Sequence, residues 1–207
     1  MLQRIPPFLL GVVLAAYWGR VLRMAYKARR RTGRAANLVP GERLGRMLRV
    51  VWAPAVALWV VHPFLTALVR YPPRLLRPLY SHLAVSWTAL AIAAACLGLT
   101  LVCWKKMGRA WRMGIDPSET TPLIATGPFA YVRHPIYALS QTMMFATIAM
   151  IPTPLMLVAA GVHIALLQWE SRREEGHLLR VHGEPYARYR AAVGRFVPRS
   201  LGPYCHS

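Results

Sequence analysis

The chain has 207 residues, the length of a single domain. Hydrophobic residues make up 56% of it and charged residues only 16%, a balance that indicates a membrane protein and argues against a soluble one. The formal net charge of +19 would suggest nucleic-acid binding in a soluble protein. The positions of the charges along the chain therefore have to decide between a nucleic acid and a membrane. We expect no cleavable secretory signal, and the three cysteines are not spaced as a disulfide framework or a metal site.

Apolar segments long enough to cross the hydrocarbon core of a bilayer occur at residues 5–26, 47–69 and 82–104. The first of them contains Arg20 and Arg23, which lie near the expected helix end, where long basic side chains reach the interface. We therefore predict that all three segments span the membrane as helices.

A fourth apolar run, from Ile136 to Trp169, is too long for one crossing and is interrupted by two prolines, one residue apart, at positions 152 and 154. Prolines at this spacing remove backbone donors and obstruct the preceding turn. We expect a hairpin of two short helices, 136–151 and 154–170. The sequence thus predicts an all-α integral membrane protein with about five transmembrane helices, the last two as a Pro-broken helical hairpin, followed by a cytoplasmic C-terminal helical extension.

The basic residues are distributed unevenly under this threading. Of the 26 Lys and Arg residues, 22 fall on one side of the membrane. The other four are Arg4, Arg70, Arg74 and Arg77. By the positive-inside rule the C-terminus is cytoplasmic and the N-terminus is outside. The positive charge is then a topology signal with some attraction to anionic membrane lipids, and we expect no nucleic-acid partner.

The seven acidic residues all fall on the predicted cytoplasmic side. Three of them, Glu170, Glu174 and Glu175, lie within six residues where the last membrane helix emerges. Such clustering in a strongly basic chain indicates that these carboxylates have a partner.

The segment 127–141 reads GPFAYVRHPIYALSQ and leads into the hairpin. Pro135 suits the first position of a helix and disfavours helical geometry at His134, so the imidazole should stand at the helix mouth beside unpaired backbone N–H groups. Tyr137 and Gln141 lie one turn apart on one face of the helix. Each feature is ordinary by itself, but together they predict a polar stripe that leads from the cytoplasmic interface into the bilayer.

The segment 170–190 is predicted to continue the last membrane helix into the cytoplasm as far as Gly183. If the two hairpin helices are antiparallel, Glu174 and Glu175 lie directly below the membrane and near His134. The alternative is a solvated helix whose glutamates pair with neighbouring arginines.

The run 123–137, which contains Arg-His-Pro-Ile-Tyr, resembles the R-H-P-x-Y signature of the isoprenylcysteine carboxyl methyltransferase and phospholipid methyltransferase family. Further stretches at residues 107–112, 174–178, 183–189 and 195–198 resemble the same family in the expected order. The likeness covers about residues 104–199, the predicted catalytic half of one membrane domain. Residues 1–103 resemble the family only in forming membrane helices.

The resemblance implies an integral-membrane enzyme that uses S-adenosyl-L-methionine without a dinucleotide-type domain, and no G-x-G-x-x-G pattern contradicts this. It implies that the cofactor-binding residues are Gly127, Phe129, His134, Pro135, Tyr137, Glu174 and Glu175. Members that methylate a prenylcysteine carboxylate carry Arg one turn before the paired glutamates, where this chain has Glu170. Either Arg172 or Arg173 replaces that Arg, or the acceptor is not a carboxylate. We therefore take Arg173 and Tyr137 as the catalytic candidates.

Polar residues within the apolar segments are further candidates for an acceptor site. His62, Gln141, His163 and Gln168 either line an acceptor tunnel or form hydrogen bonds between packed helices. His62 precedes a proline and is interpreted as structural. Gln141 and His163, on the two arms of the hairpin, are assigned with Arg173 to substrate binding.

The leading hypothesis is a metal-independent methyltransferase acting on a lipophilic acceptor that enters from the bilayer, with an isoprenylcysteine-type carboxylate as first choice. A phospholipid amine or a small thiol is the alternative within the family. Sterol reductases, which share an R-H-P-x-Y-like segment and use a nicotinamide cofactor, form a second class, but those chains are longer. A non-catalytic membrane adaptor or small transporter is the third class, and it leaves the paired glutamates without a role.

Overall fold

The computed structural model describes residues 2–32, 43–108, 111 and 122–205. In these ranges the α-helices are α1 (Ile5–Thr32), α2 (Arg43–Leu68), α3 (Leu83–Met107), α4 (Pro135–Met150), α5 (Pro154–His182) and α6 (Glu184–Ala192). The 3-10 turns are η1 (Leu2–Arg4), η2 (Arg74–Leu76) and η4 (Gly127–Ala130). The described ranges contain no β-strand, so the prediction of an all-α fold is confirmed. Glu42, Asp116, Glu119 and the motif residues Arg109, Ala110 and Arg112 lie outside them.

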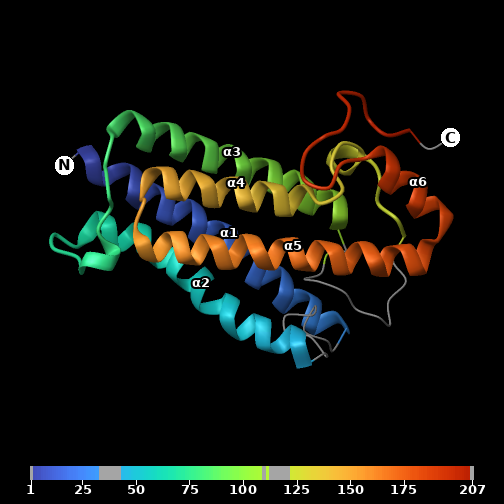
Figure 1. Ribbon diagram of the computed structural model, residues 1–207, viewed down its shortest axis with the longest axis horizontal. Coiled ribbons are helices and arrows are strands. Elements are labelled where there is room, and N and C mark those ends of the chain that lie inside the picture. The colour runs from blue at the N-terminus through green and yellow to red at the C-terminus, as the bar shows by residue number, and fades with distance from the viewer. Residues whose placement is uncertain (1, 33–42, 109–110, 112–121, 206–207) are drawn as a thin grey trace.

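Helices α1 to α5 run alongside one another as an elongated bundle (Figure 1). Helix α3 packs on α4, α1 packs on α2 and α3, and α2 packs on α5. Helix α5 continues past the bundle to one end of the molecule, where α6, η4 and the C-terminal segment gather, whereas the N-terminus lies at the other end (Figure 1). Among the described residues, the end of α5, α6 and the C-terminal segment thus project beyond the bundle at this end (Figure 1).

The centre of the bundle is apolar and buried. Leu10 and Leu14 of α1 are fully buried, as are Met143 and Met144 of α4. Trp59 of α2 is buried with them, and its indole N–H donates a 2.8 Å hydrogen bond to the Thr147 hydroxyl of α4. In a bilayer, van der Waals packing of these side chains and the interhelical hydrogen bond hold the helices together.

Three helical segments are long and apolar enough to cross a membrane by length and composition, namely Leu2–Arg30, Gly45–Leu68 and Leu83–Met107. They match the first three predicted spans to within a few residues, apart from the C-terminal end of the first helix, which extends to Thr32. This finding supports a membrane protein.

The fourth apolar run is divided at Pro152. Helix α4 ends at Met150, and α5 begins at Pro154, where the Thr153 side chain accepts a 3.1 Å hydrogen bond from the Met156 N–H. Proline at a first helical position and a threonine N-cap are both typical helix starts, which explains why the new helix begins there. The two helices lie side by side, and α5 continues without a break to His182 (Figure 1).

The C-terminal segment closes over the start of α4. Gly183 caps the C-terminal end of α5, and α6 follows at once. The φ of Gly183 is 58°, a backbone conformation that glycine adopts without strain. Beyond α6, Val132 and Gly194 form an isolated parallel bridge. The Arg133 N–H donates to the Gly194 carbonyl at 2.8 Å, and the His134 N–H donates to the Arg195 carbonyl at 3.0 Å. These bonds fix the backbone that carries the candidate site.

Candidate functional site

Two arginines and a histidine surround the carboxylate of Glu175 on α5. Arg195 donates to both carboxylate oxygens, with Nε to Oε1 at 2.8 Å and Nη2 to Oε2 at 2.7 Å. Arg133 donates from Nη2 to Oε1 at 2.9 Å, and Nε2 of His134 lies 3.2 Å from the same oxygen. The Glu175 side chain is only 4% exposed. Its carboxylate therefore joins α5 to the segment before α4 and to the C-terminal segment.

Charge balance at Glu175 favours the ionised carboxylate. Burial alone raises the pKa of Glu175, but hydrogen bonds from His134, Arg195 and Arg133 outweigh burial and lower the pKa well below its usual range. Arg133 also donates to the backbone carbonyls of Arg190 and Val193. Glu175 is thus an internal anion with its own partners.

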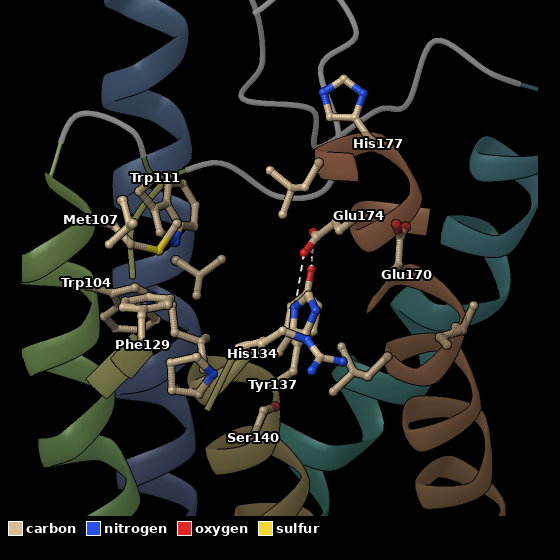
Figure 2. Close-up of a pocket in the computed structure, with 18 of the residues that line it drawn as sticks. Trp104, Met107, Trp111, Phe129, His134, Tyr137, Ser140, Glu170, Glu174 and His177 are labelled. Carbon is tan, nitrogen blue, oxygen red and sulfur yellow. Dashed lines mark hydrogen bonds and ion pairs between the residues drawn. The ribbon is translucent and has the colours of Figure 1, made fainter. Parts of the chain in front are cut away.

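Glu174 has a different environment, although it is the next residue. The Tyr137 hydroxyl donates a 2.6 Å hydrogen bond to Oε1 of Glu174, and Nδ1 of His134 lies 3.4 Å from Oε2. The Glu174 side chain keeps 22% of its surface exposed. Figure 2 shows the carboxylate above His134 and Tyr137, with dashed lines to both. Its lone pairs therefore remain accessible on the cavity side.

His134 lies between the two carboxylates. Burial lowers its pKa, but the hydrogen bonds and charges of Glu174 and Glu175 outweigh burial, and the pKa of His134 is raised. The protonated imidazole can donate from both nitrogens, as its two contacts require. The ring stacks on Tyr137, with centroids 5.5 Å apart and planes inclined by 5°. We infer a charged imidazolium that holds both glutamates.

A cavity of about 220 Å³ opens beside this cluster. Figure 2 shows Trp104, Met107, Trp111 and Phe129 on one side and Glu170, Glu174 and His177 on the other. His134 and Tyr137 lie between these two groups (Figure 2). Pro135, His163 and Arg49 also line the cavity, as do Tyr17, Trp18 and Trp52. An aromatic wall thus faces a wall that carries carboxylates, an arrangement suited to a ligand with cationic and aromatic parts.

The deep part of the cavity wall carries a neutral histidine. The Trp52 indole N–H donates to Nδ1 of His163 at 3.1 Å, and Nε2 of His163 lies 3.0 Å from the Ser140 hydroxyl. Because an indole N–H can only donate, Nδ1 must accept and the proton must lie on Nε2, which donates to Ser140. Three helices are joined here, because Trp52 lies on α2, Ser140 on α4 and His163 on α5.

The residues predicted to form the site divide into two groups. Phe129, His134, Pro135, Tyr137, His163 and Glu174 line the cavity, whereas Gly127, Gln141, Arg173 and Glu175 do not. Gln141 is buried on α4, and its side-chain nitrogen has no hydrogen-bond partner among the described residues. Arg173 lies over the Trp169 ring at 4.5 Å, with an ion pair to Glu170 at 3.6 Å. The functional roles of all ten residues stay predictions.

Sequence reasoning missed the contribution of the first two helices to the cavity. Tyr17 and Trp18 of α1 and Arg49 and Trp52 of α2 line it, and nothing in their local pattern distinguishes them from ordinary interfacial residues. Arg133 and Arg195 were within motifs that resemble the family, but their shared contact with Glu175 was not foreseen.

The fold and the cavity define a helical membrane protein with a polar cluster at the mouth of one apolar chamber. Residues 87–180 match the model of the isoprenylcysteine carboxyl methyltransferase (ICMT) family. The family resemblance expected from the sequence is confirmed. The match and the three long apolar helices both point to a membrane protein that is similar to this methyltransferase family.

One curated relative is described as the nickel-cobalt-cadmium resistance protein NccN of Alcaligenes xylosoxydans xylosoxydans. It is 28% identical over 116 residues, which cover 55% of this chain and 54% of the relative. The chain therefore spans about half the length of the curated relative that it matches. Among solved structures the comparison found no match.

Proposed function

We propose that this protein is an S-adenosyl-L-methionine-dependent membrane methyltransferase that acts on a lipophilic acceptor, with an isoprenylcysteine-type carboxylate as first choice. The observation that carries the proposal is the contact of His134 and Tyr137 with Glu174 on the wall of an aromatic cavity. The family match of residues 87–180 supports the methyltransferase class over the nicotinamide-dependent alternative.

The residues around the cavity fit the chemistry of the proposed cofactor. Glu174 offers a carboxylate that is partly exposed, and Trp104, Trp111 and Phe129 offer aromatic faces across the cavity (Figure 2). A carboxylate and aromatic faces both attract organic cations. Glu174, fixed by Tyr137 and His134, is the proposed group that holds the cofactor's amino or ribose groups. Glu175 is enclosed by cations of the protein and is proposed to fix the position of His134 and Glu174.

When bound, S-adenosyl-L-methionine supplies a methyl group, which a lone pair of the acceptor takes as the electron pair of the broken C–S bond stays on sulfur. Such a displacement requires no metal, and the protein contributes chiefly placement, which supplies up to roughly 7–11 kcal/mol. The positive charge on sulfur disappears in the reaction. A carboxylate pressed against the sulfur would therefore stabilise the ground state, so Glu174 acts best on groups away from it.

The proposed membrane arrangement has five spans, with α4 and α5 as the fourth and fifth. Helix α4 has only 16 residues, fewer than the roughly 20 of an average crossing, so the Pro152 turn is proposed to stay at membrane depth, shielded by neighbouring helices. The N-terminus is then outside, and the polar cluster with the C-terminal extension is cytoplasmic. The cofactor reaches the cavity from water and the acceptor reaches it from the bilayer.

Ligand stabilisation tests the proposed cofactor class. We expect S-adenosylhomocysteine at 100 times its Kd to raise the apparent stability of the purified protein in detergent by about 2.7 kcal/mol, and NADPH to leave it unchanged. The measurement is a thermal melt with each ligand over a concentration series. Stabilisation by NADPH and not by S-adenosylhomocysteine would overturn the proposal.

A further inference from the structure

Arg49 on α2 presents a guanidinium at the cavity wall. Its carbon Cζ lies over the Trp52 ring, 4.8 Å from the ring centroid, and its side chain is 17% exposed. Arg49 and Trp52 are separated by three positions on one helix, so the aromatic ring supports the guanidinium from the same helix face. Stacking of this kind holds the planar group in one orientation and leaves its edge available for hydrogen bonds.

The hydrogen bonds of Arg49 are incomplete. Nη2 lies 3.6 Å from Oε1 of Glu170, an ion-pair distance that is too long for a hydrogen bond. Nε is buried and makes no hydrogen bond to any described residue. A buried N–H without an acceptor is unfavourable, and a guanidinium offers five donors in a fixed fork. This geometry favours a ligand oxygen.

Glu170 pairs with a second guanidinium besides that of Arg49. Arg173 also lies 3.6 Å from Glu170, through Oε2, but Arg173 does not line the cavity. The cation on the cavity side is therefore Arg49. Arg133 and His134, the other cations of the lining, contact Glu175, and His134 contacts Glu174 as well.

Arg49 also lies near the proposed reaction centre. Glu170, the ion-pair partner of Arg49, lies one helical turn before Glu174 on α5, and all three residues line the cavity. Apart from Glu170, the described lining beside Arg49 is aromatic: Trp52 lies under the guanidinium and Trp18 packs against Trp52. A ligand that binds there has an apolar body and one anionic group.

We propose that Arg49 is the specificity-determining residue that binds an oxyanion of the lipophilic acceptor. The inference rests on the proposed function and assigns to α2 the role that sequence reasoning sought at Arg172 or Arg173. The oxyanion has two sources, the carboxylate of a lipidated cysteine and the phosphate of a phospholipid. A cationic amine without an adjacent anion is not bound there, because it would meet the Arg49 charge.

Binding of matched ligand pairs tests the proposal in the full-length protein in detergent. N-acetyl-S-farnesylcysteine is compared with its carboxamide, and a short-chain phosphatidylethanolamine with the diacylglycerol of the same chains. Quenching of tryptophan fluorescence measures each affinity. A preference of about tenfold or more for at least one anionic member is expected, the usual size for a hydrogen bond to a charged group. The pair that shows the preference identifies the source of the oxyanion.

Variants separate Arg49 from general effects. Arg49→Gln should reduce the preference to about twofold or less, and Arg49→Lys should keep part of it because the charge remains without the planar fork. Arg43→Gln, an exposed change on the same helix, is the matched control and should leave the preference unchanged. Glu170→Gln should increase it, because the competing carboxylate is removed.

The outcomes distinguish this proposal from the proposed function. Loss of the anion preference in Arg49→Gln, with stabilisation by S-adenosylhomocysteine retained, supports Arg49 as the acceptor residue. An equal preference in Arg49→Gln and wild type, or no preference for either anion in wild type, overturns the Arg49 proposal and leaves the methyltransferase class standing. Absence of stabilisation by S-adenosylhomocysteine in wild type overturns the proposed function itself.

Discussion

Glu174 and Glu175 are adjacent carboxylates with opposite accessibility. Successive residues on a helix point about 100° apart, so one side chain faces the cavity while the other faces the C-terminal segment. Glu175 meets the guanidiniums of Arg133 and Arg195, whereas Glu174 meets a phenol and an imidazole and stays partly exposed. The two glutamates of the pair therefore suit different roles: Glu174 is accessible to a ligand, and Glu175 links elements of the fold.

Single substitutions should separate these two carboxylates. We expect Glu174→Gln to weaken S-adenosylhomocysteine binding about tenfold or more with little change in melting temperature, because a charge-assisted contact is lost. Glu175→Gln should destabilise the protein by about 3–5 kcal/mol, because it leaves the buried guanidinium of Arg133 and the buried imidazole of His134 without their anion. Thermal melts with and without ligand measure both effects. Equal behaviour of the two variants would contradict the division of roles.

The imidazolium of His134 should make stability depend on pH. Its pKa is raised in the folded state, so its pairing with the glutamates is fully present below about pH 6.5, the usual histidine value, and is lost as pH rises through the raised pKa. The lowered pKa of Glu175 gives stability that is present above about pH 4.5 and lost as pH falls. We expect the melting temperature to fall below about pH 4.5 and also above the raised pKa of His134.

The matched variant for that profile is His134→Gln, which keeps a hydrogen-bonding side chain without the titrating charge. In this variant the alkaline decline of the melting temperature should disappear and the acid decline should remain. If the melting temperature of His134→Gln still falls at alkaline pH, a titrating side chain other than His134 causes that fall.

At the level of elements, the site depends on a short backbone contact between the loop before α4 and the segment after α6. Gly194 is essential to that contact, because a Cβ at this position would lie 1.8 Å from the Val197 carbonyl oxygen. The carbonyls of Gly194 and Arg195 accept the N–H groups of Arg133 and His134. The C-terminal segment thus positions the imidazole from both its backbone and its Arg195 side chain.

Gly194→Ala should therefore disturb the site without touching the cavity. We expect a loss of about 1–3 kcal/mol in the free energy of unfolding, from the forced backbone shift, and weaker S-adenosylhomocysteine binding because His134 moves. Gly202→Ala is the control, since a Cβ there meets no atom within 4 Å. Denaturation and ligand titration of both variants give the comparison. If Gly194→Ala unfolds and binds S-adenosylhomocysteine like the wild type, the backbone contact between the loop before α4 and the segment after α6 is not required.

At the level of the whole molecule, the two halves of the chain make one chamber. Helices α1 to α3 supply tryptophans and Arg49, while α4, α5 and the C-terminal segment supply the polar cluster. The family match covers residues 87–180 and so includes α4 and most of α5 but not α1 and α2. Acceptor recognition through Arg49 would therefore lie in the part of the chain that the family match does not reach.

The amino-acid sequence by itself determined the helical class, the starts of α4 and α5, the end of α5 and the segment that carries the polar cluster. These features depend on local properties, namely the length of apolar runs, proline at Pro135 and Pro154, and glycine at Gly183. Only the tertiary structure decided that Glu174 faces the cavity while Glu175 is enclosed, and that Arg49 meets Glu170. Such contacts join residues far apart in the chain, and helix packing, which local patterns do not encode, sets which side chains meet.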